Sequence, residues 1–458
     1  MARTRNIRCL AVFALAFGLC QGTTAHAAIE QVVVRQGPFT LNPYEVRFTS
    51  RKTRSVEAPG LDGYLVRMHA RVVDSAGQPI PVQRVMLHHI VYKTKARRDS
   101  VCRGAESFYG TGEENQSLRL PPGYGYRVRR RDRWVTGWML MNHRSTTDRA
   151  YIEYTAWIET SRRLRPVTPY WVRATGCHGA RDPIFNVPGG GPPGSLFRKS
   201  APWRVPHSGV LVAGGSHLHG GAYRMELDQP ACHNRRLFVS RALYGLPDHP
   251  YYQVRPVLHE PGPIAASWTT SESGIAVRRG ERLRVTAVYD GERPHTRVMG
   301  IWHLYLARGR GPRGRCVPLP RDLSSVLPPV LGRPEPPVSP VPLTGLDRNG
   351  QAVPIDRPPG PILVGDRHTD VVVGDRSFAI RNLSISAGSL VSWRFTGIGL
   401  HDVTLASGPV GFASRWSRRG QSYTRRFDLP GAYRIYCSLH PVDMTLAIDV
   451  SAGAGSGP

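Results

Sequence analysis

Short runs of alternating apolar and polar residues, separated by turn residues, limit what this chain can fold into more than any other feature. Three such runs are residues 64–74 (YLVRMHARVVD), 151–159 (YIEYTAWIE) and 282–290 (RLRVTAVYD). Side chains alternate across a strand, so each run predicts a strand with one buried face. The 40 prolines and 48 glycines favour strands and turns over long helices. We therefore predict an all-β chain, and its 458 residues predict several domains.

Composition changes along the chain divide it into segments. Strand patterns fill residues 28–308 and return at 366–450. Between them, residues 309–365 are rich in proline and arginine, as in LPPVLGRPEPPVSPVP (327–342), which predicts an extended linker. Residues 451–458 (SAGAGSGP) predict a flexible tail.

The N-terminus has the pattern of an export signal. Arg3, Arg5 and Arg8 precede the apolar run CLAVFALAFGLC (9–20), and AHA (25–27) supplies small residues at the cleavage spacing. The run is shorter than the roughly 20 residues that span a bilayer. We predict a signal peptide at 1–27 and a secreted or extracytoplasmic protein.

The net charge is +28, and it falls to +25 without the three signal arginines. Such a surface attracts polyanions. The basic residues are scattered and form no nucleic-acid motif, so we expect no specific nucleic-acid partner. An electrostatic association with an anionic cell envelope fits this pattern better.

The cysteine count points to a metal site near the C-terminus. Removal of the signal leaves an odd number of cysteines: Cys102, Cys177, Cys232, Cys316 and Cys437. Cys437 lies in YCSLHPVDM with His440 and Met444, and His401 lies upstream in GLHDVTL. A thiolate, two imidazoles and a thioether together suit copper that cycles between two oxidation states. The alternative is a β-sandwich with a buried free cysteine and a degenerate site.

This pattern closely resembles the cupredoxins, the small blue-copper proteins. The resemblance implies a small Greek-key β-sandwich at 366–450. It also implies a type 1 copper with His401, Cys437 and His440 as equatorial ligands and Met444 as the axial one. Asp402 stands where many cupredoxins have asparagine, so we expect a hydrogen bond that tunes the thiolate to differ.

Histidines recur in the N-terminal region within four motifs. These are MLHHIVY (His88, His89), WMLMNHRS (His143), GGSHLHGG (His217, His219) and PHTRVMGIWHLYLA (His295, Met299, His303). On a strand, His217 and His219 face the same side, as do Met299 and His303. His88 and His89 face opposite sides unless the strand is bent there. Imidazole and thioether donors favour copper over calcium or magnesium.

The order of these motifs resembles that of the copper type II monooxygenases and of plant stress-induced nodulin-like proteins. The resemblance implies two tandem β-sandwich domains, at 28–165 and 166–308, with one copper each across a wet cleft. It implies an electron-transfer copper at His88, His89 and His143, and an oxygen-activating copper at His217, His219 and Met299, with His303 as a rival or additional ligand. We assign no catalytic residue beyond these ligands.

The remaining cysteines follow the histidine motifs along the chain. In an oxidising compartment we predict disulfides Cys102–Cys177 and Cys232–Cys316, although two other connectivities stay open.

Two functions of different kinds follow from the residues. One is a copper-dependent monooxygenase whose cupredoxin relays electrons, with an external electron donor and a small organic substrate as partners. The alternative is a non-enzymatic copper-binding, copper-handling or electron-carrier protein of the cell envelope. A multicopper oxidase is excluded, because Cys437 lacks the flanking histidines of that family.

Overall fold

The computed structural model describes residues 29–49, 54–177 and 183–452. The predicted signal peptide and most of the predicted tail lie outside these ranges. Nearly every regular element is a strand, and the only helices among the described residues are the 3-10 turns η1 (Pro230–Cys232) and η2 (Pro250–Gln253). The all-β prediction is confirmed. No helix in the described part is long and apolar enough to cross a membrane.

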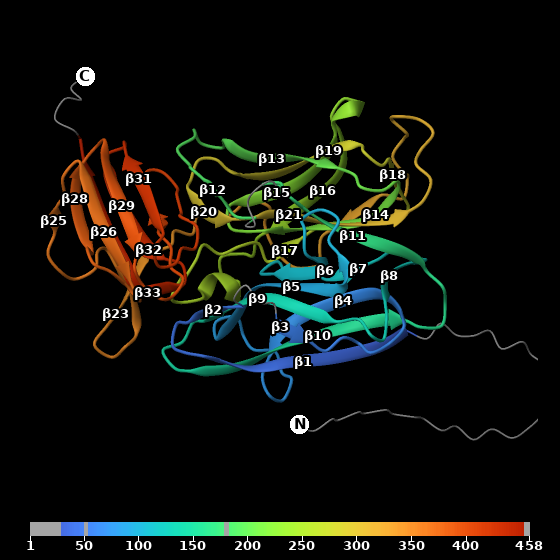
Figure 1. The fold of residues 1–458 in the computed structure, drawn as a ribbon, viewed down its shortest axis with the longest axis horizontal. Helices are drawn as coiled ribbons and strands as arrows, with labels where there is room; N and C mark the ends of the chain where they lie inside the picture. The colour runs from blue at the N-terminus through green and yellow to red at the C-terminus, as the bar shows by residue number, and fades with distance from the viewer. Residues whose placement is uncertain (1–28, 50–53, 178–182, 453–458) are drawn as a thin grey trace, which may run out of the picture.

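The first sandwich packs two antiparallel sheets around one core (Figure 1). One sheet runs β1 (Ile29–Leu41), β10 (Asp148–Glu159), β4 (Gly63–Val73) and β8 (Tyr124–Val128), with β7 (Leu118–Arg119) beside β4. The other runs β2 (Val46–Phe48), β9 (Trp134–Asn142), β5 (Val85–Arg98) and β6 (Ala105–Gly112), with β3 (Arg54–Val56) beside β9. Aromatic rings such as Trp134, Phe108 and Tyr154 fill the space between them.

The second sandwich has the same two-layer plan. One sheet runs β11 (Arg165–Arg173), β21 (Gly300–Arg308), β14 (Gly209–Leu218), β18 (Trp268–Val277) and β22 (Ser324–Val326). The other runs β13 (Leu196–Arg204), β19 (Arg282–Asp290), β15 (Ala222–Gln229), β16 (Arg235–Leu243) and β17 (Ala265–Ala266), and a further pair joins β12 (Phe185–Val187) to β20 (His295–Val298). Parallel pairing of β8 with β11 makes one sheet continuous through both sandwiches.

The C-terminal sandwich stands beside the first two and is coloured orange to red in Figure 1. Its sheets run β25 (Leu363–Val364), β28 (Asn382–Ser386), β33 (His440–Ser451), β32 (Gly431–Cys437) and β30 (Thr404–Ser407), and β27 (Ser377–Phe378), β26 (His368–Gly374), β29 (Ser389–Phe395) and β31 (Ser422–Phe427). Its core is continuous with Val46, Met86 and Met139 of the first sandwich. The domain is therefore docked through apolar contacts.

The proline-rich segment differs from the extended linker that its composition predicts. β22 adds an edge strand to the second sandwich, and β23 (Leu343–Leu346) with β24 (Ala352–Ile355) forms a hairpin. Val341 and Leu343 are buried against Tyr436, and β25 pairs with β28 before residue 366. Scattered apolar residues bury against the neighbouring domains, and this contact outweighs the preference of proline for open chain.

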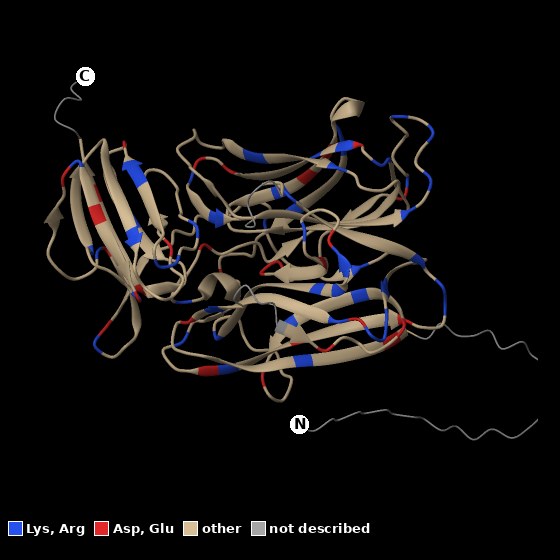
Figure 2. Cartoon of the chain, in the orientation of Figure 1, with Lys and Arg blue, Asp and Glu red and all other residues tan. Residues whose placement is uncertain are grey.

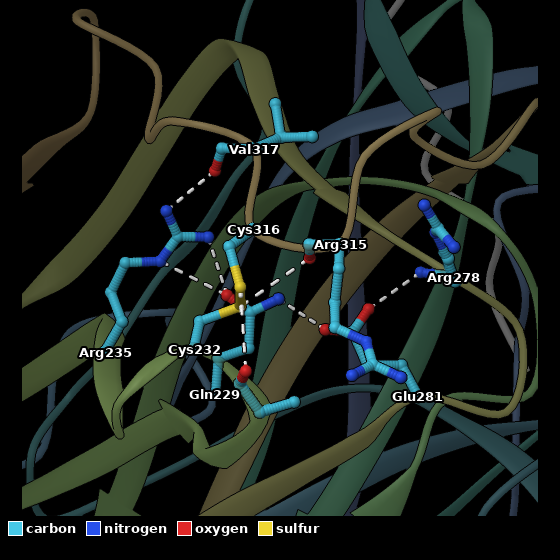
Figure 3. Close-up of a disulfide and its surroundings, with 9 residues drawn as sticks. Gln229, Cys232, Arg235, Arg278, Glu281, Arg315, Cys316 and Val317 are labelled. Atoms are coloured by element: carbon cyan, nitrogen blue, oxygen red, sulfur yellow. Dashed lines mark hydrogen bonds between the residues drawn. A yellow bond between two sulfur atoms is a disulfide. The ribbon is translucent and has the colours of Figure 1, made fainter.

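Two disulfides cross-link the N-terminal part of the chain. The structure joins Cys102 to Cys177 and Cys232 to Cys316, as predicted. Figure 3 shows the second bond next to Arg235, which donates hydrogen bonds to Gln229 and to the Val317 carbonyl. Among the described residues, Cys437 is the one free cysteine, and it is buried.

Lysines and arginines are spread over all three sandwiches (Figure 2). Several neutralise buried carboxylates: Arg35 and Arg71 both pair with Glu153, and Arg236 and Arg284 both pair with Asp228. Part of the positive charge thus stabilises the fold.

Candidate copper centres

The hairpin between β32 and β33 builds the thiolate site. Tyr436 pairs with Thr445 while Cys437 pairs with His440, so the residues between His440 and Thr445 bulge out of the register. This irregular turn sets the Cys437 Sγ atom 3.6 Å from the His440 Nδ1 atom. His401 comes from a loop bridged to Ser417, and its ring centroid lies 4.9 Å from that of His440.

The donor atoms of His401, Cys437 and His440 all lie within 4.8 Å of one another. Met444 is fully buried in the same core as Cys437. Burial lowers the pKa of His440 to about 4 and raises the pKa of the Cys437 thiol. The imidazole is therefore neutral and ready to ligate, whereas the thiol must lose its proton to a bound metal.

Asp402 organises the surroundings of the thiol. Its backbone N–H donates to Cys437 Sγ at 3.4 Å, and its carboxylate accepts from the Ser438 N–H at 2.7 Å and from the Ser438 hydroxyl at 2.5 Å. Arg297 of the second sandwich pairs with the same carboxylate at 2.9 Å. Aspartate at this position thus supports a charged contact that an asparagine would lack.

A bulge in β5 lets the adjacent residues His88 and His89 line the same cavity. The register against β9 shifts between Leu87 and His89, so the strand is bent there, as binding by both rings requires. The two ring centroids lie 5.1 Å apart, and both residues line one cavity of about 70 Å³.

His217 lies near the end of β14 and His219 directly follows the strand, and the two rings come together, as the alternation predicts. Their Nε2 atoms lie 3.1 Å apart, a separation at which both can bond to one ion at about 2 Å. On its far side, His217 Nδ1 lies 3.1 Å from Glu114. Burial opposes protonation, but Glu114 raises the pKa of His217 above its ordinary value. This carboxylate orients the ring, as partners of metal-bound histidines do.

The close approach of these elements depends on one glycine. A Cβ atom at Gly112 would lie 2.6 Å from the His88 carbonyl oxygen and 2.9 Å from His217 Cε1. Gly112 thereby lets the end of β6 pass between the two histidine motifs.

The two histidine groups are in contact, which differs from the cleft that the monooxygenase resemblance implies. The His88 ring centroid lies 5.1 Å from that of His219, and the His89 centroid lies 6.1 Å from that of His217. The strand β5, which carries His88 and His89, and the strand β14, which carries His217, belong to different sheets. The two histidine groups therefore meet through side-chain contacts between the sandwiches, and they do not face each other across open solvent.

His143 follows β9 and lies at the margin of this cluster. Its Nδ1 atom is 3.1 Å from the Pro256 carbonyl, to which it can donate, and burial lowers its pKa to about 4. Its Nε2 atom is buried and has no hydrogen-bond partner in the described part of the chain.

Met299 and His303 face one larger cavity of about 400 Å³ together with Ile301, as the predicted strand face requires. His89 and His217 also line this cavity, and the His303 ring stacks on Trp171 at 4.0 Å. His295 does not line this cavity. It is buried in ion pairs with Glu260 at 2.8 Å and Asp290 at 3.6 Å.

Three residues of the cluster were not predicted. Glu113 and Glu114 follow β6 in a turn, and His259 lies in the loop after η2. His259 Nε2 is 2.5 Å from Glu113 Oε1, and the His88 and His259 ring centroids lie 4.7 Å apart. No spacing rule connects these residues, so only the fold brings them together.

The donor chemistry fits copper. Buried imidazole nitrogens that have no hydrogen-bond partner among the described residues occur at both centres: His89 Nδ1, His143 Nε2, His259 Nδ1, His303 Nε2 and His401 Nδ1. Leaving such atoms unpaired costs about 1–3 kcal/mol each, a cost that metal ligation removes. Imidazole donors suit copper at the cluster, and the added thiolate suits a redox-active copper at Cys437.

Trp416 lies between the two centres. Its indole N–H donates to the Ser438 hydroxyl at 3.3 Å, directly after Cys437. The same side chain lines both cavities of the histidine cluster and packs on Phe48 of the first sandwich, with ring centroids 4.6 Å apart.

The β-sandwiches, the thiolate site and the imidazole cluster define a copper redox protein. Comparisons with known proteins agree with this class. Over 206 residues, 42% of the chain, it is 28% identical to "Probable copper-dependent oxygenase M1" of Phoma sp.. Over 151 residues, 31% of the chain, it is 27% identical to "Probable copper-dependent oxygenase clz3" of Cochliobolus lunatus. Over 76 residues, 16% of the chain, it is 33% identical to amicyanin-alpha of Methylorubrum extorquens.

These similarities are partial. The chain spans about half the length of the two oxygenases, 52% and 47%, and 64% of amicyanin-alpha. No family model matches the chain. Similar solved structures include an oxidised amicyanin mutant (20% identity, 19% of this chain, 85% of that chain, TM-score 0.18). Another is a purple cupredoxin from Nitrosopumilus maritimus (21% identity, 18% of this chain, 99% of that chain, TM-score 0.16).

Proposed function

We propose that this protein is a secreted copper-dependent monooxygenase-like oxidoreductase with a fused electron-transfer domain. The observation that carries the proposal is that one side chain, Trp416, lies against both the thiolate site and the histidine cluster of the same chain. Trp416 touches Ser438, next to the thiolate ligand, and also lines the cavities of the histidine cluster.

Each ligand set has its own proposed task. His401, Cys437, His440 and Met444 hold a type 1 copper. His217, His219 and Met299 hold the oxygen-activating copper, with His303 as a rival or additional ligand, and His88, His89 and His143 hold the electron-transfer copper. Copper supplies one-electron redox chemistry and oxygen activation, while the protein fixes the ligands and the position of the substrate.

The cavity of about 400 Å³ is the proposed substrate site. Its volume lies within the range of small-molecule pockets, about 300–1,000 Å³. Aromatic walls at Trp138 and Trp171 and the cationic side chains Lys93 and Arg173 line it beside His217. This mixture favours a small organic substrate with an apolar body and an anionic or polar group.

Oxygen uptake tests the proposal. Copper-loaded full-length protein, supplied with a reductant and a panel of small C–H substrates, should consume oxygen and form hydroxylated product. His217→Ala should abolish turnover and keep the thiolate absorption band. His368→Ala changes an exposed residue of β26 and should affect neither. Wild-type protein that binds copper at the histidines without oxygen uptake would contradict the enzyme function.

The second candidate is a non-enzymatic copper-binding or electron-carrier protein of the cell envelope. Burial of the cluster favours it, because His217 is only 7% exposed and the imidazoles are in mutual contact. A reservoir would release copper to a chelator and show no turnover. The dispersed arginines would add electrostatic association with an anionic envelope, which salt should weaken.

A further inference from the structure

Two histidines from distant parts of the chain converge on one carboxylate oxygen. His88 Nδ1 and His259 Nε2 both contact Glu113 Oε1, and the distance from His259 is 2.5 Å. The three residues come from β5, from the turn after β6 and from the loop after η2. One donor atom from each lies within 4.8 Å of the others.

The carboxylate is held in this orientation from behind. Glu113 Oε2 accepts the Gly262 N–H at 2.7 Å, which leaves Oε1 directed at the two imidazoles. The Glu113 side chain is only 5% exposed. The Nδ1 atom of His259 is also buried, and it has no hydrogen-bond partner in the described part of the chain.

The donor types of the group suit a cation. A carboxylate between two imidazoles offers three donor atoms at one point, as metal binding requires.

We infer that His88, Glu113 and His259 form a binding site for a divalent transition-metal ion, with Glu113 as a direct ligand. A carboxylate beside two imidazoles suits Cu²⁺, Zn²⁺ or Fe²⁺ and disfavours Cu⁺, which prefers softer donors. The site goes beyond the proposed function, since it adds an oxygen ligand and requires metal binding only, without oxygen activation.

His88 also belongs to the proposed electron-transfer set with His89 and His143, so the two assignments compete for it. In the carboxylate site, Glu113 and His259 replace His143 as the partners of His88. His143 Nδ1 faces the Pro256 carbonyl, which makes it the natural variant for separating the assignments.

Zinc binding to full-length protein tests the inference, because Zn²⁺ is redox-silent. The Cys437→Ala variant serves as background, so that the thiolate site does not compete. Metal-free protein is titrated with Zn²⁺, and bound zinc is counted by mass spectrometry after gel filtration. Glu113→Gln and His259→Gln should each weaken one site by at least about 100-fold, the upper end of effects seen for partners outside the ligand shell.

Matched controls guard against loss of fold. Glu106→Gln removes another buried carboxylate, which lies within β6 and pairs with Arg97 instead of histidines. This variant should leave zinc binding unchanged. Thermal unfolding of each metal-free variant reports folding. Glu113→Gln keeps the size of the side chain and its contact with Gly262, so it should stay folded.

The outcomes separate the two proposals. If His143→Gln removes one zinc and Glu113→Gln removes none, the carboxylate site is wrong and the all-histidine set stands. If Glu113→Gln and His259→Gln each remove one zinc but the copper-loaded wild type consumes no oxygen, the carboxylate site stands and the monooxygenase function fails. Equal zinc binding by all variants overturns the inference.

Discussion

Arg297 of the second sandwich and Asp402 of the C-terminal sandwich form a buried ion pair, with 2.9 Å between Nη1 and Oδ2. The Arg297 side chain is 11% exposed and that of Asp402 is not exposed at all. The same guanidinium lies over the Trp416 ring, 4.9 Å from its centroid. Arg297 therefore contacts both the carboxylate of Asp402, which lies beside the thiol, and the ring of Trp416, and it does so where the second and C-terminal sandwiches meet.

Arg297→Gln should destabilise the protein, because it leaves Asp402 buried without a counter-charge. Breaking a buried pair from one side costs about 3–5 kcal/mol. Denaturant unfolding followed by tryptophan fluorescence measures the loss. The exposed pair Arg376–Asp443 is the control, and Arg376→Gln should cost no more than about 1 kcal/mol. Equal effects of both variants would mean that Asp402 is not held by Arg297.

Cys437→Ala should remove the intense thiolate absorption of the copper-loaded protein and leave copper at the histidine cluster. The thiolate is the source of that band, and no other free cysteine lies in the described part of the chain. Optical spectra with a copper count measure both effects. Ser438→Ala keeps the thiolate and should retain the band. An unchanged spectrum in Cys437→Ala would rule out thiolate ligation.

Glu114→Gln should weaken copper binding at His217 and His219 without removing a ligand. The carboxylate lies 3.1 Å from His217 Nδ1, and loss of such a partner typically costs about 10–100-fold in metal affinity. Competition with a copper chelator measures the change. Glu226→Gln, a buried carboxylate paired with Arg198 and Arg224, should leave affinity unchanged. A larger loss of copper affinity in Glu226→Gln than in Glu114→Gln would place His217 outside the metal site.

His295 should make stability depend on pH in the alkaline range. Burial lowers its pKa, but Glu260 and Asp290 outweigh burial and raise it to about 9, from an ordinary value of 6.5. Arg293, which pairs with Asp290, and the Tyr289 ring also face this group. Because the folded state holds the proton more tightly, the stabilisation is fully present below pH 6.5 and is lost as pH rises through about 9.

Melting temperatures of the wild type and of His295→Gln, measured between pH 6 and pH 10, check this expectation. The difference between the two proteins should shrink as pH rises. A constant difference would show that His295 acts through packing alone.

Local sequence periodicity anticipated much of the fold and the direction of individual side chains. Alternation along a strand predicts that His217 and His219 share a side, as do Met299 and His303, and both pairs do come together in the structure. His219 directly follows β14, and Met299 lies between β20 and β21. The bend at His88 follows from the demand that two adjacent residues bind together. The paired strands in the proline-rich segment were not foreseen, because their stability comes from apolar contacts with other domains.

The sequence by itself determined the kinds of donor available and the strands that carry them, because residue identity and the two-residue period of a strand are local properties. Only the tertiary structure decided which donors meet. Glu113 and His259 lie 146 residues apart, and Arg297 and Asp402 belong to different sandwiches. Their contacts depend on how the sheets join at β8 and β11 and on how the C-terminal sandwich docks, and these arrangements arise from burial of apolar surface between elements remote in the chain.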